Sequence, residues 1–499
     1  MKRIDNDLLS IQEARILVEN AREAQKSLAA FPQEKLDKIV ECMAAEVVKN
    51  ARDLAVMSQE ETGFGRWQDK LIKNIFASDY LFKKLKTMKV VGIVAEDKIN
   101  KTMDIGVPLG VIVALPPATN PVSTTIYKAL IAIKSGNAIV FSPHPKAKRT
   151  IGKALEVLIR AAEGNGLPSG AIGYLQTITA QGTAEMMKHN DTALILVTGV
   201  PKMLEAAHKA GKPVIYGGPG NGPAFIERSA DIKQAVKDII SSRTFDHGII
   251  SASEQSIVVE ECIADEVRRE LRNHGACFLS EGESQELSKL FLRSDGTINS
   301  EIVGRSAGEI AAKIGMQVPE ETKVLISEQK YVSDDNPYSK EKLCPVLAFY
   351  VEKDWLNACE KCIELLLNEG QGHTLVIHSQ NEHVIREFAL KKPVSRVLVN
   401  TPATLGGIGA TTNLFPALTL GCGAAGGAST SDNVSPMNLI NIRKVGYGVR
   451  TLEDITKISP PGSEVRSKDD GQFVVQRSGE SSQDLKNLLV ELLEELRTR

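Results

Sequence analysis

The sequence lacks a long apolar run. No uninterrupted apolar span reaches ~20 residues, the length that a helix needs to cross a bilayer. The first residues, Met1 to Asp7, also lack the apolar core of an export signal. From these absences we expect neither membrane insertion nor export.

An excess of charge of one sign is absent as well. The chain has 60 basic and 62 acidic residues, and no basic stretch is interleaved with aromatic residues. Nucleic acid is therefore not an expected partner. The seven cysteines are odd in number and mostly far apart, which favours reduced thiols in a cytoplasmic compartment over a disulfide framework.

Metal-ligand spacing is scarce. Cys359 and Cys362 form a CxxC, but they lie in a segment with amphipathic helical spacing and no second ligand pair is nearby. Buried core thiols explain such a pair better than a metal or redox site does. We predict no metal site.

What the chain does contain is an α/β pattern. With 499 residues it is too long for one core, so two or three domains are expected, and 39 glycines suit close approaches of backbone to ligand. Strand-like runs alternate with helix-period segments from Val111 onward, the runs being residues 111–115, 138–141 and 193–197. This alternation predicts a parallel doubly wound sheet with ligand at the carboxyl ends of its strands. Residues 251–435 repeat the alternation less regularly, which suggests a second α/β domain.

The two ends of the chain differ from this middle part. Residues 10–90 have helical spacing, and residues 90–94 and 102–107 are expected to be two strands of a hairpin-like arm. Residues 456–482 are polar and typical of a linker. The last segment, 483–499, carries an unbroken leucine stripe and predicts an amphipathic helix. That helix could dock on its own core, pair as a coiled coil (for which it is short), or serve as a targeting peptide.

The stretch from Thr244 to Ser256 joins a helix-period segment to an apolar strand-like run, residues 257–259. Ser251 stands at this junction, where a nucleophile can be held rigidly close to backbone N–H groups. The plain alternative is a serine-rich turn, because serine is a common turn residue.

The order Phe-Asp-His-Gly-Ile-Ile before Ser251, and Ala-Ser-Glu-Gln after it, resembles the nucleophile segment of CoA-acylating aldehyde dehydrogenases, including the aldehyde domain of bifunctional aldehyde–alcohol dehydrogenases. The resemblance covers roughly residues 10–450. It implies an aldehyde dehydrogenase-like fold with a Rossmann-type cofactor domain, an α/β catalytic domain and a small β oligomerisation arm. The expected ranges are 1–240 for the NAD(H)/CoA-binding domain, with 97–110 in the arm, 241–435 for the catalytic domain and 436–455 for the oligomerisation strand. The arm implies a homodimer or larger.

The resembling family has a catalytic cysteine where this chain has Ser251. A thiolate adds to an aldehyde and later leaves from a thioester, whereas a serine hydroxyl offers no accessible anion near neutral pH. We therefore expect the chain with Ser251 to have little or no catalytic activity. A deliberate Cys→Ser replacement and a natural non-catalytic relative both explain the serine.

The resemblance assigns two further catalytic residues. Asn120 lies in the loop from Pro116 to Pro121 that follows the first parallel strand, and its amide would stabilise the oxyanion of the adduct. His373, in Gln-Gly-His-Thr, would assist proton removal. Each has a plain alternative, since Asn-Pro starts turns and His373 could be a structural histidine. His247 is a less suitable base.

The resemblance also predicts NAD along the first sheet. The expected contacts are Ser142, Pro143 and His144 at the adenosine ribose, Thr198, Gly199 and Val200 at the pyrophosphate, Glu341 in the motif ending at Pro345 at the nicotinamide ribose, and Pro116, Thr119 and Gly218 near the reacting carbon. Leu420 and Gly421 are expected near the acyl or CoA channel. Residues 421–426 match G-x-G-x-x-G, a weak signal without a strand before it and a helix after it. NADP in place of NAD stays open.

Hydrolysis and acyl transfer are distinguished by one segment. Hydrolytic relatives have Glu-x-Gly-Gly, where this chain has Ile215-Tyr216-Gly217-Gly218, and residues 213–226 contain no Asp or Glu. Without a positioned base, water attacks a thioester slowly, so that coenzyme A can react with it first. The sequence thus predicts oxidation of a short-chain aldehyde, such as acetaldehyde or propionaldehyde, to acyl-CoA with NAD and CoA. A hydrolytic enzyme and a non-catalytic cargo protein are the alternatives.

The identity of the aldehyde stays open, because charged short aldehydes have acylating enzymes of similar pattern. Short amphipathic tails on polar linkers resemble the encapsulation peptides of bacterial microcompartment enzymes. We therefore expect segment 483–499 to target the protein, in the cytoplasm, to a microcompartment shell or its cargo.

Overall fold

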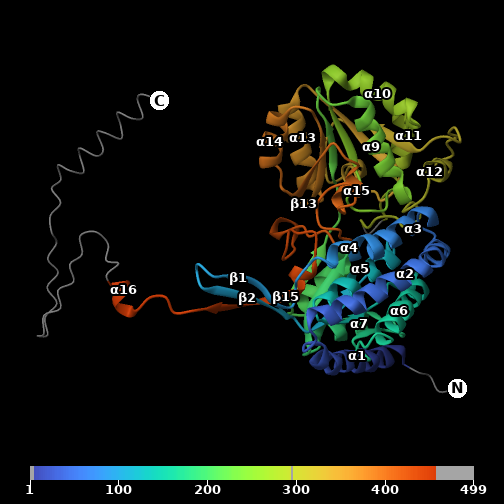
Figure 1. The fold of residues 1–499 in the computed structure, drawn as a ribbon. Helices are drawn as coiled ribbons and strands as arrows, with labels where there is room; N and C mark the ends of the chain where they lie inside the picture. The colour runs from blue at the N-terminus through green and yellow to red at the C-terminus, as the bar shows by residue number, and fades with distance from the viewer. Residues whose placement is uncertain (1–4, 200, 294–295, 457–499) are drawn as a thin grey trace, which may run out of the picture. The chain divides into compact units, whose positions relative to one another are not determined.

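The computed structural model of the protein describes residues 5–199, 201–293 and 296–456. Contacts divide the chain into a main unit, residues 1–95 and 104–443, and a second unit with residues 96–103 and those from 444 onward. The main unit contains two sheets, of five and seven strands (Figure 1). In the described residues no helix is long and apolar enough to cross a membrane.

The five-stranded sheet is parallel, with the order β5-β4-β3-β6-β7. Its strands are β3 (Val111–Leu115), β4 (Ala138–Phe141), β5 (Ile172–Tyr174), β6 (Thr192–Thr198) and β7 (Val214–Gly217). The predicted strands 111–115 and 138–141 are confirmed with the same bounds, and 193–197 lies inside β6. The doubly wound α/β prediction for this part of the chain is therefore confirmed.

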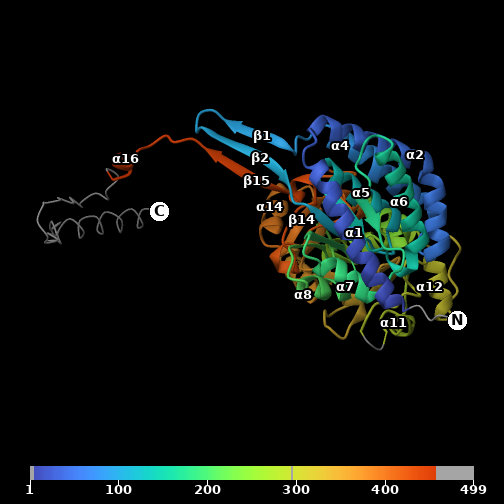
Figure 2. The same ribbon diagram turned by 90° about the horizontal axis from the view of Figure 1, so that it is seen from below.

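Helices cover both faces of this sheet, as Figures 1 and 2 show. The helices of this part of the chain are α1 (Asn6–Leu28), α2 (Gln33–Thr62), α3 (Trp67–Ile75), α4 (Leu81–Leu85), α5 (Pro121–Lys134), α6 (Lys148–Glu163), α7 (Ala180–Lys188) and α8 (Pro201–Lys209), of which α3 and α4 pack on α2 and α5. Successive side chains of a strand point to opposite faces, so Ile112 and Ala114 join the core with α2, α5 and α6. Val111 and Val113 join the core with α1 and α7.

The seven-stranded sheet is also parallel, with the order β10-β11-β12-β9-β8-β13-β14. Its strands are β8 (Pro223–Ile226), β9 (Ser256–Glu260), β10 (Ala276–Phe278), β11 (Val324–Glu328), β12 (Val346–Glu352), β13 (Gly372–His378) and β14 (Val394–Val399). β8 belongs to this sheet although it precedes residue 240, where we placed the domain boundary. Strand pairing, which chain order does not dictate, brings β8 between β9 and β13.

Two cores cover the faces of the second sheet. One includes α13 (Trp355–Asn368), α14 (Glu382–Leu390), α11 (Glu281–Ser288) and α12 (Ala307–Lys313); the other includes α9 (Ile232–Thr244), α10 (Ala264–Asn273) and α15 (Ala403–Gly407). Cys359 and Cys362 are buried in the first of these cores. In the part of the chain that the structure describes, no three His, Cys, Asp or Glu side chains gather to hold a metal.

A third sheet contains β1 (Gly92–Asp97), β2 (Thr102–Pro108) and β15 (Ile440–Gly446), in the order β1-β2-β15. The expected hairpin-like arm is therefore made of strands, and a short helix, α16 (Leu452–Thr456), follows. The role of these segments in oligomerisation stays a prediction. The expected targeting helix and most of the expected linker lie outside the described residues.

Candidate active site

A cavity of about 630 Å³ lies in the main unit. The segments after β3, β4, β6 and β7 contribute to its wall, so it lies at the carboxyl ends of the first sheet. Its volume suits a small-molecule or cofactor site. Its lining includes Ser251, Asn120, Thr119, His144, Thr198, Gly199, Gly218, Glu341 and Leu420. The structure thus gathers into one cavity residues that the sequence places as far apart as positions 119 and 420.

The loop before Ser251 is turned by left-handed backbone. After α9 ends at Thr244, Asp246, His247 and Gly248 have φ angles of 49°, 54° and 69°. Non-glycine residues adopt this conformation only when the surroundings compensate for its cost. The chain then buries Ile249 and Ile250 and leaves Ser251 half-buried at the cavity wall.

The Ala-Ser-Glu-Gln residues after Ser251 support the loop from behind. The fully buried Arg243 donates to Ser253 Oγ at 2.7 Å and to Gln255 Oε1 at 2.9 Å. Glu254 accepts the backbone N–H of Ala403 at 2.8 Å, and burial raises the pKa of its carboxyl to about 7. These side chains face the protein interior, so this part of the motif holds the shape of the loop.

Gly220 is packed between the backbone of Ser251 and the imidazole of His373. A β-carbon at Gly220 would lie 1.8 Å from the Ser251 carbonyl oxygen and 3.3 Å from His373 Nδ1. Glycine is therefore required at this position, and the predicted base is a neighbour of the predicted nucleophile across the glycine backbone.

His373 is fully buried on β13, and it is absent from the described residues that line the cavity. Neither ring nitrogen has a hydrogen-bond partner among the described residues. Burial, followed by the charge of Arg396, holds the pKa of His373 well below its ordinary value. The imidazole is therefore neutral near pH 7. Its nitrogens, partner-free among the described residues, suit a proton acceptor, and Gly220 brings one of them near the backbone of Ser251.

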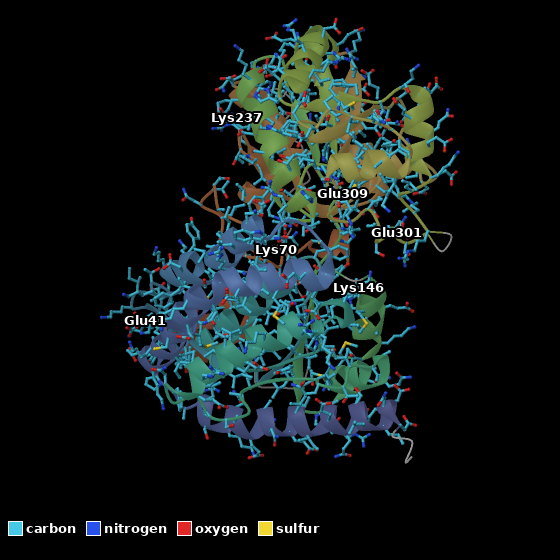
Figure 3. All side chains as sticks on the ribbon, turned by 90° about the vertical axis from the view of Figure 1, so that its right-hand side faces the viewer. Glu41, Lys70, Lys146, Lys237, Glu301 and Glu309 are labelled. Carbon is cyan, nitrogen blue, oxygen red and sulfur yellow. The ribbon has the colours of Figure 1, made fainter. Side chains whose placement is uncertain are left out.

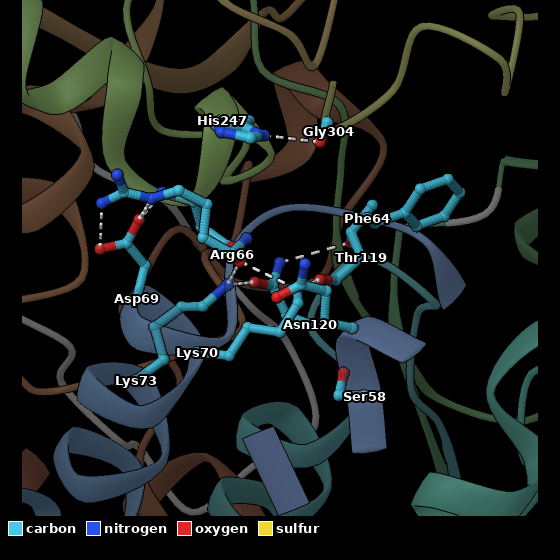
Figure 4. A network of polar contacts seen from close by, with 12 residues as sticks. Ser58, Phe64, Arg66, Asp69, Lys70, Lys73, Thr119, Asn120, His247 and Gly304 are labelled. Atoms are coloured by element: carbon cyan, nitrogen blue, oxygen red, sulfur yellow. Dashed lines mark hydrogen bonds and ion pairs between the residues drawn. The ribbon is translucent and has the colours of Figure 1, made fainter. Parts of the chain in front are cut away.

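His247, the second histidine considered, points elsewhere. Its Nδ1 lies 2.9 Å from the carbonyl oxygen of Gly304 (Figure 4), and the residue is not among the described cavity-lining ones. A structural role for His247 explains this contact.

Asn120 precedes α5, and Pro121 is the first residue of that helix, where its missing N–H costs little. The Asn120 amide nitrogen lies 3.3 Å from Thr119 Oγ1, and its amide oxygen accepts a hydrogen bond from Lys73. Both Thr119 and Asn120 line the cavity together with Ser251. An amide donor and the candidate nucleophile therefore share one space, as the oxyanion interpretation requires.

Two carboxylates reach the cavity wall, Glu341 and Glu369. Glu341 accepts the backbone N–H of Gly220 at 2.9 Å, and Glu369 accepts the N–H of Glu341 at 2.5 Å. Burial raises the pKa of Glu341 to about 8, and the Glu369 charge adds to the shift. Glu341 was expected here from its motif, whereas Glu369 was not.

The other expected cofactor contacts do not line the cavity in the described structure: Pro116, Ser142, Pro143, Pro345 and Gly421. The Ser142 hydroxyl bonds that of Thr183 at 2.8 Å. Val200 lies outside the described residues. The G-x-G-x-x-G match contains only a short 3-10 turn, Ala424–Gly426, so no helix N-terminus is formed there.

Segment 215–218 reaches the cavity with Tyr216, Gly217 and Gly218 and not with Ile215. The Ile215 side chain is buried in the core shared with α2 and α5, and it is Tyr216 that reaches the cavity. Gly218 donates its N–H to Cys422 Sγ at 3.2 Å. Alternation along β7 explains why the position matched to the glutamate faces away from the cavity.

Sequence reasoning missed most of the apolar cavity wall beyond the nucleophile motif, including Phe64, Val303, Ile408 and Leu418. It also missed Arg293, an exposed basic residue on the wall; Lys146, the other exposed basic residue there, follows the Ser142–His144 segment that was predicted at the ribose. Figure 3 labels Lys146 between the helices of the two sheets. No local pattern marks these residues, because they come from loops that meet only in the folded chain.

Comparison with known proteins finds aldehyde dehydrogenases by family profile, by sequence and by structure. The profile of the aldehyde dehydrogenase family matches residues 8–278. The chain is 42% identical over 441 residues to the bifunctional aldehyde-alcohol dehydrogenase AdhE of Escherichia coli K12, covering 87% of this chain and 49% of that protein. It is 35% identical over 439 residues to a succinate-semialdehyde dehydrogenase (acetylating) of Clostridium kluyveri, covering 88% and 96%. A crystal structure of a probable aldehyde dehydrogenase from Listeria monocytogenes EGD-e superposes with a TM-score of 0.89 at 55% identity, covering 91% and 100%.

Proposed function

The chain belongs to the aldehyde dehydrogenase family, and we propose that its site is built to oxidise a short-chain aldehyde with NAD and to transfer the acyl group to coenzyme A. The observation that carries the proposal is the cavity in which Ser251, Asn120 and Glu341 meet. Because the chain spans 49% of the length of the E. coli relative, nothing is inferred about the second activity of that protein.

The cavity supports formation of an adduct at position 251. A nucleophile there would add to the aldehyde carbon, and the negative charge that develops on oxygen would face the Asn120 amide. Donors fixed before the reaction stabilise this charge without having to reorganise. His373, neutral and adjacent across Gly220, is the nearby group that could accept the proton of the attacking residue or of the CoA thiol.

The residues present fit a dinucleotide. Glu341 brings a carboxyl group that can exchange hydrogen bonds with ribose hydroxyls, and the exposed Lys146 brings a cation suited to phosphate. Gly199 has a φ of 64°, and a β-carbon added to it would lie 3.6 Å from the β-carbon of Pro117. Because Gly199 has no side chain, its backbone can approach a ligand closely. NAD would supply the hydride acceptor. Thr198 and His144 complete the part of the wall formed by the first sheet.

Acyl transfer to CoA is favoured over hydrolysis by the groups near the reaction centre. Residues 213–226 contain no Asp or Glu. Tyr216 is on the cavity wall, but burial raises the pKa of its phenol, which therefore stays protonated and cannot act as a base. The Glu341 side chain, whose pKa of about 8 keeps it protonated near pH 7, and the Glu369 side chain each already accept a backbone N–H. Water therefore lacks the glutamate base that hydrolytic relatives have in this segment, and the CoA thiol, whose proton His373 could accept, is the better nucleophile toward a thioester.

The wall near the candidate nucleophile favours an uncharged aldehyde. Ile249, Ile250, Val303, Ile408 and Leu420 line the cavity and belong to one continuous apolar core. A sulfonate or carboxylate placed among these apolar side chains would lose hydration, and the basic residues of the wall, Arg293 and Lys146, come from other segments. We therefore propose an acetaldehyde-like or propionaldehyde-like substrate.

The serine is the main obstacle to this activity. Ser251 occupies the nucleophile position, and its hydroxyl lacks the accessible anion of a thiol. We propose that the chain as written is nearly inactive and that Ser251→Cys restores turnover.

The test measures NADH and acyl-CoA formation from acetaldehyde and propionaldehyde, with and without CoA, for the chain and for Ser251→Cys. Turnover by the cysteine variant only, with acyl-CoA as product, supports the proposal. Free acid formed without CoA would show a hydrolytic enzyme instead. Tight binding of NAD and CoA by both proteins with no turnover by either would favour a non-catalytic role.

Targeting to a bacterial microcompartment remains a separate proposal, based on segment 483–499 and its leucine stripe. Its test is encapsulation of a reporter fused to this segment in cells that produce shells.

A further inference from the structure

A buried cluster of charges lies directly against Asn120. It contains Lys70 and Lys73 of α3, which Figure 4 labels near Asn120, and Asp246 of the loop that precedes Ser251; their exposed fractions are 3%, 2% and 0%. Both lysines pair with the same carboxylate oxygen, Asp246 Oδ2, and the Lys70 distance is 3.0 Å. The proposed reaction at Ser251 assigns no role to these three residues.

Lys73 determines how the Asn120 amide is turned. Its ammonium group has donors and no acceptor, so it can bond only the oxygen end of the amide, Asn120 Oδ1. The NH₂ end must then point away from Lys73. One of its protons can go to Thr119 Oγ1, 3.3 Å away, and the other remains available on the cavity side.

Lys73 also strengthens the amide as a donor. A cation on the carbonyl oxygen polarises the amide group and makes its N–H protons more positive. The cluster as a whole has two cations and one anion, since Asp69 is matched by its own partner, Arg66, at 2.8 Å. One excess positive charge therefore lies buried at the Asn120 amide oxygen, and it acts on the adduct oxygen through this polarised amide.

The same cluster is connected to the nucleophile. Asp246 lies five positions before Ser251, and Asp246 itself is held by two backbone contacts: its N–H donates to Asp69 Oδ2 at 2.9 Å, and its Oδ1 accepts the N–H of Arg66 at 2.6 Å. Gly65 leaves room for this carboxylate, since a β-carbon there would lie 1.9 Å from Asp246 Oδ1. Lys70 adds a bond to the Thr119 carbonyl at 3.3 Å.

We propose that Lys73, anchored by Asp246, is a positioning residue that orients and polarises the Asn120 amide and sets it in register with the loop of Ser251. The inference rests on the proposed function, because it concerns the adduct formed at position 251. It explains why two lysines on one turn of α3 are buried against one carboxylate.

The test uses the Ser251→Cys protein as parent and compares Lys73→Met, Asn120→Ala and the double variant. Removal of one oxyanion donor costs ~10²–10³-fold in kcat, so Asn120→Ala should fall in that range. Lys73→Met should lower kcat by about tenfold or more, with a much smaller change in KM. The double variant should be no slower than Asn120→Ala alone, because the lysine acts through the amide.

Lys73→Gln separates orientation from folding. A glutamine amide can still donate to Asn120 Oδ1, so this variant should retain more activity than Lys73→Met. Lys83→Met, which removes an exposed lysine paired with Asp79 on the neighbouring α4, is the matched surface control and should behave as the parent does. Thermal unfolding of each variant confirms that folded proteins are compared.

Alkylation of position 251 by iodoacetamide, followed by peptide mass spectrometry, gives a readout that needs no oxyanion. Its rate should change far less than kcat in Lys73→Met. Equal losses in both rates, or additive losses in the double variant, would overturn the positioning role. An active parent with an equally active Lys73→Met protein would overturn this inference alone, whereas an inactive parent would overturn the proposed function and the inference with it.

Discussion

Two buried cations support the loop of Ser251 from opposite ends, and they are held in different ways. Lys73, with Lys70, faces the carboxylate of Asp246 before the nucleophile. In the described residues, the hydrogen bonds of Arg243 go to neutral acceptors, namely Ser253 Oγ, Gln255 Oε1 and, at 3.1 Å, the carbonyl oxygen of Val346.

The electrostatic consequences follow from this difference. Burial alone would raise the pKa of Asp246, but the two lysines hold it below its ordinary value. Burial lowers the pKa of Arg243 to about 10, because no carboxylate bonds it directly. The lysine cluster thus maintains a charge next to a residue on the cavity wall, whereas Arg243 joins loop segments inside the core.

The two clusters therefore support the Ser251 loop for different purposes, one for catalysis and one for the packing of the core. The cluster before Ser251 reaches Asn120, and through it the site of chemistry. The cluster after Ser251 reaches Gln255, which also accepts the backbone N–H of Lys342 at 3.0 Å, and so holds neighbouring strands in place. Changes to the first should affect rate and stability, and changes to the second should affect mainly stability.

The largest effect is expected for Asp246→Asn. This change keeps the shape but leaves two buried ammonium groups without an anion, and breaking such a pair costs about 3–5 kcal/mol. Denaturation in urea measures the loss. Asp265→Asn is the control, because its exposed pair with Arg268 should contribute less than about 1 kcal/mol.

Arg243→Met should cost less, about 1–3 kcal/mol, because it leaves unpaired neutral acceptors and no charge. In the Ser251→Cys background its kcat should change little compared with Lys73→Met. A loss as large as that of Asp246→Asn would contradict the distinction between the two clusters.

Glu341→Gln should change how stability depends on pH. The folded-state pKa of about 8 lies above the ordinary value of 4.5, so the folded chain keeps a proton that the unfolded chain has lost between these values. Stability from this group is therefore complete below pH 4.5 and falls as pH rises towards 8. The glutamine variant cannot titrate there, so it should melt at a higher temperature than the parent at pH 9, with a smaller difference at pH 5. Calorimetry of the ligand-free proteins at the two pH values measures this; equal slopes for both proteins would contradict it.

The smallest effect is expected for Ser253→Ala. It removes one neutral partner of Arg243, whose guanidinium retains Gln255 and Val346, so the cost should stay below about 1.5 kcal/mol. Urea denaturation beside Arg243→Met gives the value. A cost above that of Arg243→Met would mean that Ser253 has a further role in the loop.

The strands of the first sheet could be predicted because each is a short apolar run between helix-period segments, as in Val111–Leu115. Ser251, Asn120 and Glu341 could be predicted as site residues because each lies in a recognisable local motif, and the structure places all three on one cavity. Lys70 and Lys73 could not. In sequence they are lysines of an ordinary amphipathic helix, for which a solvated face is the usual expectation.

Asp246 shows the same limit from the other side. It belonged to the motif by which the nucleophile segment was identified, yet its partners lie 173 and 176 positions earlier in the chain. His373 was assigned beside the reaction centre from its motif. Only the packing of Gly220 between it and Ser251 shows that the imidazole is close while remaining off the cavity wall.

The sequence by itself determined the class of fold, the family and the position of the candidate nucleophile, because periodicity and local motifs are properties of short segments. The tertiary structure alone decided which charges are buried, which side of β7 faces the cavity, and how the Asn120 amide is turned. These depend on contacts between segments far apart in the chain, where the cost of burying a charge is offset only when its partner arrives from another element. Ser251 is fixed by the sequence, and its surroundings are fixed by the fold.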